Sequence, residues 1–124
     1  MTRAILITGS RDWTDRARIR RVLANEASRP GAIVIHGAAG GADTIADEEA
    51  RALGMVVERY PADWKRHRKA GGPIRNGVML ARLLALRDEG ASVAVYAFPL
   101  PGSVGTHDMI ERARRAGVDV EVVT

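Results

Sequence analysis

Short apolar runs that alternate with longer amphipathic stretches constrain the fold of this 124-residue chain more than any other feature. The runs have the length of strands and occupy residues 4–8, 32–35, 55–60, 91–97 and 118–122. The stretches between them carry apolar side chains at helical spacing and occupy residues 15–28, 42–53, 74–86 and 104–116. Because strands joined by helices run parallel with right-handed crossovers, the pattern predicts an α/β fold, a three-layer sandwich around a five-stranded parallel sheet.

The composition of each run indicates its place in the sheet. Residues 4–8, 32–35 and 91–97 are mostly apolar and contain no charged residue, which is typical of strands buried on both faces. The runs at 55–60 and 118–122 contain charged residues and suit the two edges. Since no linker or internal repeat interrupts the pattern, we expect residues 1–124 to form a single domain.

Composition limits the possible functions. The net charge of +4 favours anionic partners, from a phosphate to a nucleic acid. The chain has no cysteine, so disulfides and thiolate-bound zinc are excluded, and no apolar stretch approaches the roughly 20 residues that cross a bilayer. The three histidines lack the spacing of metal ligands. We therefore expect a cytoplasmic protein with no membrane contact, no metal and no cofactor.

Residues 74–86 form a helix that is apolar around most of its circumference, with Val78, Met79, Leu80, Leu83, Leu84 and Leu86. A helix of this kind is buried on more than one side. In a chain this short, the second side suits a subunit interface, which predicts a homo-oligomer. The alternative is that the rest of the same chain covers the helix.

The first predicted strand ends in a polar turn of Gly9, Ser10, Arg11, Asp12 and Trp13. Glycine permits close approach of a ligand to the backbone, and an arginine can bind a phosphate through two parallel hydrogen bonds. Trp13 offers a flat surface on which a base can stack. The alternative is that Trp13 packs into the core while Asp12 or Thr14 caps the next helix.

The loop after the second strand consists mostly of small residues and runs through His36, Gly37, Ala38, Ala39, Gly40, Gly41, Ala42 and Asp43. Small side chains leave backbone N–H groups exposed at the start of a helix, which favours anion binding. No Gly-Lys-Ser/Thr follows, so the loop is not a Walker A motif. Asp43 either caps the helix or accepts a ribose hydroxyl, and His36 is either a ligand contact or a satisfied buried residue.

Two more helix starts carry candidate residues. The turn after the fourth strand contains Gly102, Ser103, Gly105 and Thr106, and the third long helix begins near Arg75 and Asn76. Ligands of open parallel sheets bind beyond the carboxyl ends of the strands. We therefore expect both glycine turns and the arginine-bearing first turn to meet at one edge, with Arg75 facing a shared anion. Trp64 either fastens its own loop to the core or forms a wall of the pocket.

Taken together, these residues resemble the SLOG superfamily, and within it the YspA-like branch. The motifs that carry the resemblance are Ile7 to Arg11, His36 to Asp43, Gly72 to Asn76 and Pro101 to Thr106. The resemblance implies a Rossmann-like domain with strand order 3-2-1-4-5 that binds nucleotides or nucleotide-derived ligands. Relatives include cytokinin-activating phosphoribohydrolases and the DNA-processing protein that loads recombinase on single strands.

The sequence departs from the phosphoribohydrolases at the turn before the last helix. Their loop reads Pro-Gly-Gly-x-Gly-Thr and is followed by a catalytic Glu. Here Ser103 replaces the second glycine and Met109 stands in the position of the Glu. Methionine cannot act on a proton or stabilise a cationic sugar as a carboxylate does. Asp108 is the weak candidate to substitute, although one helical position turns a side chain by about 100 degrees.

The expected function is binding of a phosphorylated nucleotide or nucleotide-derived ligand, as a sensor or processing module. The first alternative is a phosphoribohydrolase-like enzyme that hydrolyses the N-glycosidic bond of a nucleoside monophosphate. The second is binding of single-stranded nucleic acid through the basic cluster at residues 65–69 and the neighbouring Trp64. Aromatic residues make up only 4% of the chain, which argues against a long stacking platform.

Overall fold

The computed structural model describes residues 2–124 and contains one sheet of five parallel strands. The strands lie in the order β3-β2-β1-β4-β5, as the SLOG resemblance implies. Their bounds are Arg3–Gly9 for β1, Ile33–His36 for β2, Val56–Arg59 for β3, Ser92–Phe98 for β4 and Val120–Val122 for β5. The fold is therefore α/β and Rossmann-like, with β3 and β5 at the edges.

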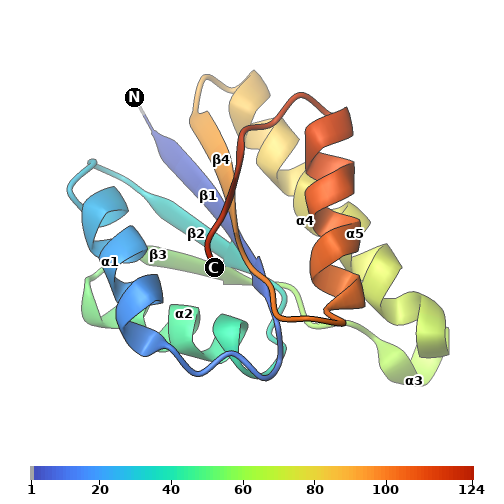
Figure 1. Ribbon diagram of the computed structural model, residues 1–124. Coiled ribbons are helices and arrows are strands. Elements are labelled where there is room, and N and C mark those ends of the chain that lie inside the picture. The colour runs from blue at the N-terminus through green and yellow to red at the C-terminus, as the bar shows by residue number, and fades with distance from the viewer. Residues whose placement is uncertain (1) are drawn as a thin grey trace.

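Helices cover both faces of the sheet (Figure 1). On one face lie α1, Arg16–Ala27, and α2, Ala42–Ala52, while α4, Gly71–Asp88, and α5, Val104–Arg115, cover the other. The short α3, Trp64–His67, and the 3-10 turn η1, Arg68–Ala70, lie beyond one end of the sheet and lead directly into α4. No helix between residues 2 and 124 combines the length and apolar character needed to cross a bilayer.

The central strand β1 divides the core into two halves. Ile5 and Ile7 pack with residues of α1 and α2, whereas Ala4 and Leu6 pack with residues of α4 and α5. Successive side chains of a strand point to opposite faces, so a strand covered on both faces is apolar at every position. This explains the continuous apolar run that begins the sequence.

Two local expectations are wrong. The helix predicted over residues 74–86 begins at Gly71, two positions before Pro73, and residues 64–70, for which the pattern predicts no element, form α3 and η1. A proline in the first turn of a helix loses no hydrogen bond, so it does not mark the first residue. The cap of α1 is Asp15, whose carboxylate accepts a hydrogen bond from Arg18 N, and neither Asp12 nor Thr14 has this role.

Candidate functional site

The carboxyl ends of β1 and β4 bring two of the predicted turns together. The two strands pair along their whole length, from Arg3 opposite Ser92 to Gly9 opposite Phe98. The pairing continues into the turn, because Ser10 N donates to Phe98 O at 3.0 Å. The residues after Gly9 and after Phe98 therefore leave the sheet side by side.

The turn after β1 also contacts the start of α2, and glycine makes this approach possible. Ala42 N donates to Ser10 O at 3.1 Å. A Cβ on Gly9 would lie 2.5 Å from Ala42 Cβ, and one on Gly41 would collide with the carbonyl oxygens of Ser10 and Arg11. Gly41 also has a φ of +62°, a conformation that side chains disfavour. Larger residues at these positions would separate the two loops.

A cavity of about 500 Å³ lies where these loops meet the amino termini of α4 and α5. Ten of the residues predicted from sequence line it: Gly9, Ser10, Arg11, Asp43, Arg75, Asn76, Gly102, Ser103, Gly105 and Thr106. Five others do not line it: Trp13, His36, Gly37, Ala38 and Gly40. The cavity is thus built mainly from the β1 turn, the β4 turn and the first turn of α4.

The amino terminus of α5 opens into this cavity without a side-chain cap within the described residues. Ser103 occupies the capping position, but its Oγ accepts a hydrogen bond from Leu100 N at 3.0 Å instead of capping the helix. By contrast, the caps of α1 and α3 are aspartates whose carboxylates accept backbone N–H groups. An uncapped helix start presents N–H groups and the positive end of the helix dipole to an anion.

Two arginines line the cavity and, within residues 2–124, neither forms an ion pair with a carboxylate. Arg75 donates from Nη1 to Gly37 O at 2.5 Å and from Nε to Asn76 Oδ1 at 3.2 Å. Burial lowers the pKa of Arg75, the nearby charge of Asp43 opposes this effect, and the charge of Arg11 adds to it. Two guanidinium groups close together without an ion pair favour an anionic ligand.

Asp43 is the only residue in the described chain with a buried side-chain oxygen that has no hydrogen-bond partner. The residue is 5% exposed, and its Oδ2 accepts hydrogen bonds from Gly37 N at 3.1 Å and Ala39 N at 3.2 Å. Burial raises the pKa of Asp43 above its ordinary value despite these hydrogen bonds and the nearby charge of Arg75. Asp43 therefore fastens the loop before α2, while Oδ1 remains free to accept a hydrogen bond.

Asp108 and Met109 lie next to each other on α5 but face different surroundings. Asp108 lines the cavity, and its Oδ2 accepts hydrogen bonds from Asn76 Nδ2 at 3.0 Å and Arg112 Nε at 2.8 Å. Met109 is completely buried in the apolar core beneath α4 and α5. The position that is a catalytic Glu in the phosphoribohydrolases therefore holds a core side chain here.

The two tryptophans have different places. Trp13 is 6% exposed, meets Phe98 edge-on with ring centroids 5.4 Å apart, and donates from Nε1 to Asp15 O at 2.9 Å. Trp13 is therefore a core residue, which is the alternative given for it above, and it does not offer a surface on which a base can stack. Trp64 is 45% exposed, lines the cavity and lies 5.3 Å below the guanidinium of Arg11. It also rests on the start of α4, where a Cβ on Gly71 would lie 3.1 Å from its ring.

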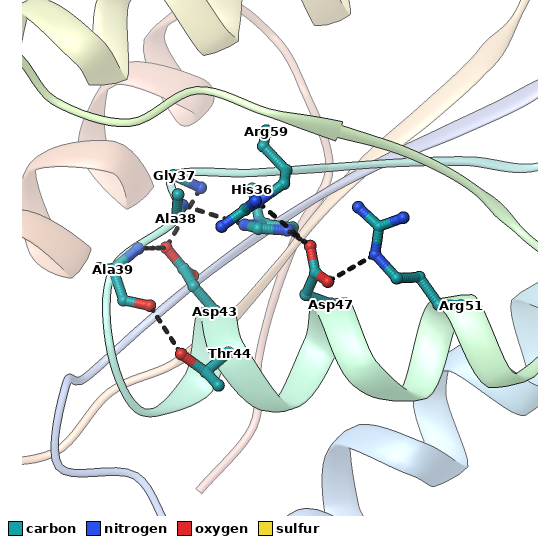
Figure 2. A network of polar contacts seen from close by, with 9 residues as sticks. All are labelled: His36, Gly37, Ala38, Ala39, Asp43, Thr44, Asp47, Arg51 and Arg59. Carbon is teal, nitrogen blue, oxygen red and sulfur yellow. Dashed lines mark hydrogen bonds and ion pairs between the residues drawn. The ribbon is translucent and has the colours of Figure 1, made fainter.

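The loop after β2 is held from below by α2 (Figure 2). Nδ1 of His36 accepts a hydrogen bond from Ala38 N at 3.0 Å, so Nε2 carries the proton that is shared with Asp47 Oδ2 at 2.6 Å. Figure 2 shows Arg51 and Arg59 on either side of the same Asp47 carboxylate. His36 is 1% exposed, and both of its ring nitrogens have hydrogen-bond partners. Of the two predicted alternatives, it is therefore the satisfied buried residue and not a ligand contact.

Several cavity residues were not chosen as ligand contacts from the sequence. Seven of them lie inside the predicted motifs: Thr8, Asp12, Ala39, Gly72, Pro73, Pro101 and Val104. Lys69 and Met79 lie outside the motifs. Met79 follows Arg75 by one helical turn and has no polar signature that could have revealed it. Across the described part of the chain, no group of three or more His, Asp or Glu side chains is arranged to hold a metal ion.

The sequence of the same loops connects the chain to a known family. The profile of the YAcAr family, described as the YspA, cpYpsA-related SLOG family, matches residues 3–67. This segment is more than half of the chain and includes β1, the turn after it, the loop after β2 and α2. The chain belongs to the YspA-related SLOG family. The SLOG resemblance inferred from the four motifs is therefore confirmed.

One curated protein and two solved structures are similar to this SLOG chain. The Gene 61 protein of Mycobacterium phage D29 is 41% identical over 125 residues, covering 95% of this chain and 94% of that protein. Among solved structures, TM1055 is 17% identical with a TM-score of 0.62, covering 95% of this chain and 72% of that one. DNA processing protein A (DprA) from Streptococcus pneumoniae is also 17% identical, with a TM-score of 0.53. The SLOG chain is covered to 97% but spans only 58% of DprA, so this likeness concerns the fold.

Proposed function

We propose that this protein binds a phosphorylated nucleotide or nucleotide-derived ligand in the cavity beyond β1 and β4. The observation that carries the proposal is the uncapped amino terminus of α5, which opens into the same cavity as Arg75 and Arg11. A phosphate at this helix start would accept hydrogen bonds from the first N–H groups of α5. The two guanidinium groups would balance its charge.

The rest of the cavity suits a nucleoside. Trp64 and the 80% exposed Val104 provide apolar surface at its walls, against which a base would pack. Asp43 borders the cavity, and its Oδ1 would accept a hydrogen bond from a ribose hydroxyl once ligand binding uncovers this buried atom. A phosphate, a hydroxyl and a base would thus each meet a side chain of matching chemistry within about 500 Å³, which is in the usual range for small-molecule sites.

A thermal-shift screen tests the proposal. The probes are nucleoside mono-, di- and triphosphates, ADP-ribose, cyclic nucleotides and inorganic phosphate alone. A ligand at 100 times its dissociation constant stabilises a fold by about 2.7 kcal/mol, which is readily measured as a rise in Tm. We expect at least one nucleotide to raise Tm more than inorganic phosphate does.

Arg75→Ala is the decisive variant, and Arg114→Ala is its matched control. Arg114 is exposed on α5 outside the cavity, so its loss changes the net charge equally without changing the site. Each variant is compared with its own ligand-free Tm, which removes any effect of losing the hydrogen bond to Gly37. We expect Arg75→Ala to abolish the nucleotide-dependent rise and Arg114→Ala to keep it. A flat screen with the wild-type protein, or an unchanged rise in Arg75→Ala, would refute the proposal.

Hydrolysis of an N-glycosidic bond is the second candidate, and the Asp108 carboxylate in the cavity is the observation that favours it. In such a reaction, water adds to the anomeric carbon of the sugar and the base leaves. Release of free base from nucleoside monophosphates by the wild type, and its loss in Asp108→Asn, would support this activity. Binding without base release would leave the protein a sensor or binding module.

A further inference from the structure

The outward face of α4 differs from the outward faces of the other long helices. Before Arg87, every exposed residue of α4 is uncharged: Pro73, Ile74, Val78, Ala81 and Ala85. Ile74 and Val78 are 44% and 50% exposed. By contrast, α1 exposes Arg18, Arg20 and Arg21 to solvent. A contiguous apolar stripe on a surface helix indicates a contact with another molecule.

The stripe consists of Ile74, Val78, Ala81 and Ala85, spaced alternately by four and three residues. Such spacing keeps all four side chains on one line along a helix. The other apolar side chains of α4, such as Leu80, Leu83 and Leu84, pack within the chain's own core. The apolar residues of α4 are therefore of two kinds: some are packed in the core, and those of the stripe are exposed on the described chain, residues 2–124.

Charge is distributed unequally between the two ends of this helix. Arg68 and Lys69 lie in η1, just before α4, and Arg87, Asp88 and Glu89 follow the stripe at the carboxyl end. All five are exposed, and none forms an ion pair within residues 2–124. One end of the stripe is thus basic, and the other has a net charge of −1.

We propose that two copies of this chain associate through their α4 stripes in an antiparallel, two-fold arrangement. The stripe is complementary to itself only in this orientation: Ile74 meets the partner's Ala85, and Val78 meets the partner's Ala81. A large side chain then lies opposite a small one at each position, which permits close packing. The same register brings Arg68 and Lys69 next to the partner's Asp88 and Glu89.

A consequence concerns the ligand cavity. Lys69 lines the cavity and also lies at the basic end of the stripe. In the antiparallel pair, the partner's acidic helix end lies at the mouth of each cavity, on the side of α3 and η1. Each cavity would therefore be bordered by residues from both chains, although the residues that hold the ligand belong to one chain.

The first test measures the monomer–dimer equilibrium of the full chain by sedimentation equilibrium. Val78→Glu introduces two like charges close to the two-fold axis, and like charges placed together at an interface cost several kcal/mol. We expect its dimer dissociation constant to rise on the order of 100-fold. Ala24→Glu, on the exposed face of α1, is the matched control and keeps the wild-type constant. Circular dichroism verifies that both variants are folded.

The second test addresses the orientation. Reversing one end, with Arg68→Glu and Lys69→Glu or with Asp88→Lys and Glu89→Lys, places like charges together in the antiparallel pair and weakens the dimer. Combining all four changes restores opposite charges and restores the dimer. A monomeric wild type, or a dimer that Val78→Glu leaves intact, would overturn the proposal. Failure of the combined variant to recover would overturn the antiparallel arrangement.

Discussion

Neighbouring residues of α5 show how the chemistry of this site depends on single positions. Asp108 lines the cavity, whereas Met109 is completely buried between α4, α5 and the sheet. A carboxylate is thus present beside the cavity, but one helical position away from where the phosphoribohydrolases have theirs. Because adjacent helical positions differ by about 100 degrees, the two side chains cannot replace each other without a change in the backbone.

Introducing the relatives' glutamate tests this interpretation. Met109→Glu should lower the free energy of unfolding by at least about 3 kcal/mol, because the carboxylate would lose its hydration among apolar side chains. His107→Glu, two positions earlier and exposed, should change it by no more than about 0.5 kcal/mol. Urea unfolding measures both. A stable Met109→Glu protein would mean that position 109 can turn toward the cavity.

Asp43 should make stability depend on pH. Because burial raises the folded-state pKa of Asp43, the native protein binds a proton more tightly than the unfolded chain does. Its contribution to stability therefore falls as the pH rises from about 4, the ordinary value for Asp, through the folded-state pKa. Above that pKa the full cost of burying the charge is present.

The corresponding variant is Asp43→Asn, which keeps an oxygen for the hydrogen bonds from Gly37 and Ala39. It should be more stable than the wild type at neutral pH, and the difference should disappear below about pH 4. Chemical unfolding at a series of pH values measures this. Lower stability of the variant at neutral pH would show that the charge of Arg75 outweighs the cost of burial.

At the scale of elements, the site depends on how closely the starts of three helices approach the strand ends. The turn after β1 contacts the start of α2 through Ser10 and Ala42, and it lies beside the end of β4. Trp64 of α3 rests on the first turn of α4 and lies beneath Arg11. The elements are therefore connected through contacts that only small residues permit.

Gly41→Ala should disrupt this arrangement more than an ordinary glycine substitution. Gly117 also has a positive φ but open space around it, so Gly117→Ala should cost about 1–2 kcal/mol for the strained backbone alone. At Gly41 the new Cβ would also collide with the carbonyl groups of Ser10 and Arg11, raising the cost to at least about 3 kcal/mol. Thermal unfolding of the two variants gives the comparison, and equal losses would contradict it.

At the scale of the whole molecule, the net charge of +4 attracts any polyanion, so binding alone does not identify the ligand. The dependence of affinity on salt concentration distinguishes a nucleic acid from a single nucleotide as the ligand. Nucleic acid bound through six or more phosphates loses about a thousandfold in affinity between about 50 and 200 mM salt. A single nucleotide with one or two phosphate contacts should lose less than about tenfold.

We therefore expect the affinity for the nucleotide that raises Tm in the thermal-shift screen to depend only weakly on salt concentration. Calorimetry at several salt concentrations measures it. A steep slope, together with tight binding of a single-stranded oligonucleotide, would favour the basic segment at residues 65–69 as the binding surface.

The sequence alone determined the layers, the two edge strands and the edge of the sheet where the cavity lies. Continuous apolar runs identified the inner strands because a strand covered on both faces can hold no charge. Arg75, Asp43 and the turn from Gly102 to Thr106 were found because parallel strands direct their following loops to one edge. These inferences need only local periodicity and chain connectivity.

Tertiary structure decided which of two roles each ambiguous residue has. Trp13 lies in the core and Trp64 lines the cavity, although the sequence allows either aromatic side chain to stack on a base. His36 forms a hydrogen bond with Asp47, eleven positions away, and Met109 belongs to the same core cluster as residues of α4. The direction of a side chain depends on the elements that pack against it, and this packing joins residues far apart in the chain. For that reason the sequence identifies the edge where the site lies, and only the folded structure shows which side chains face the cavity.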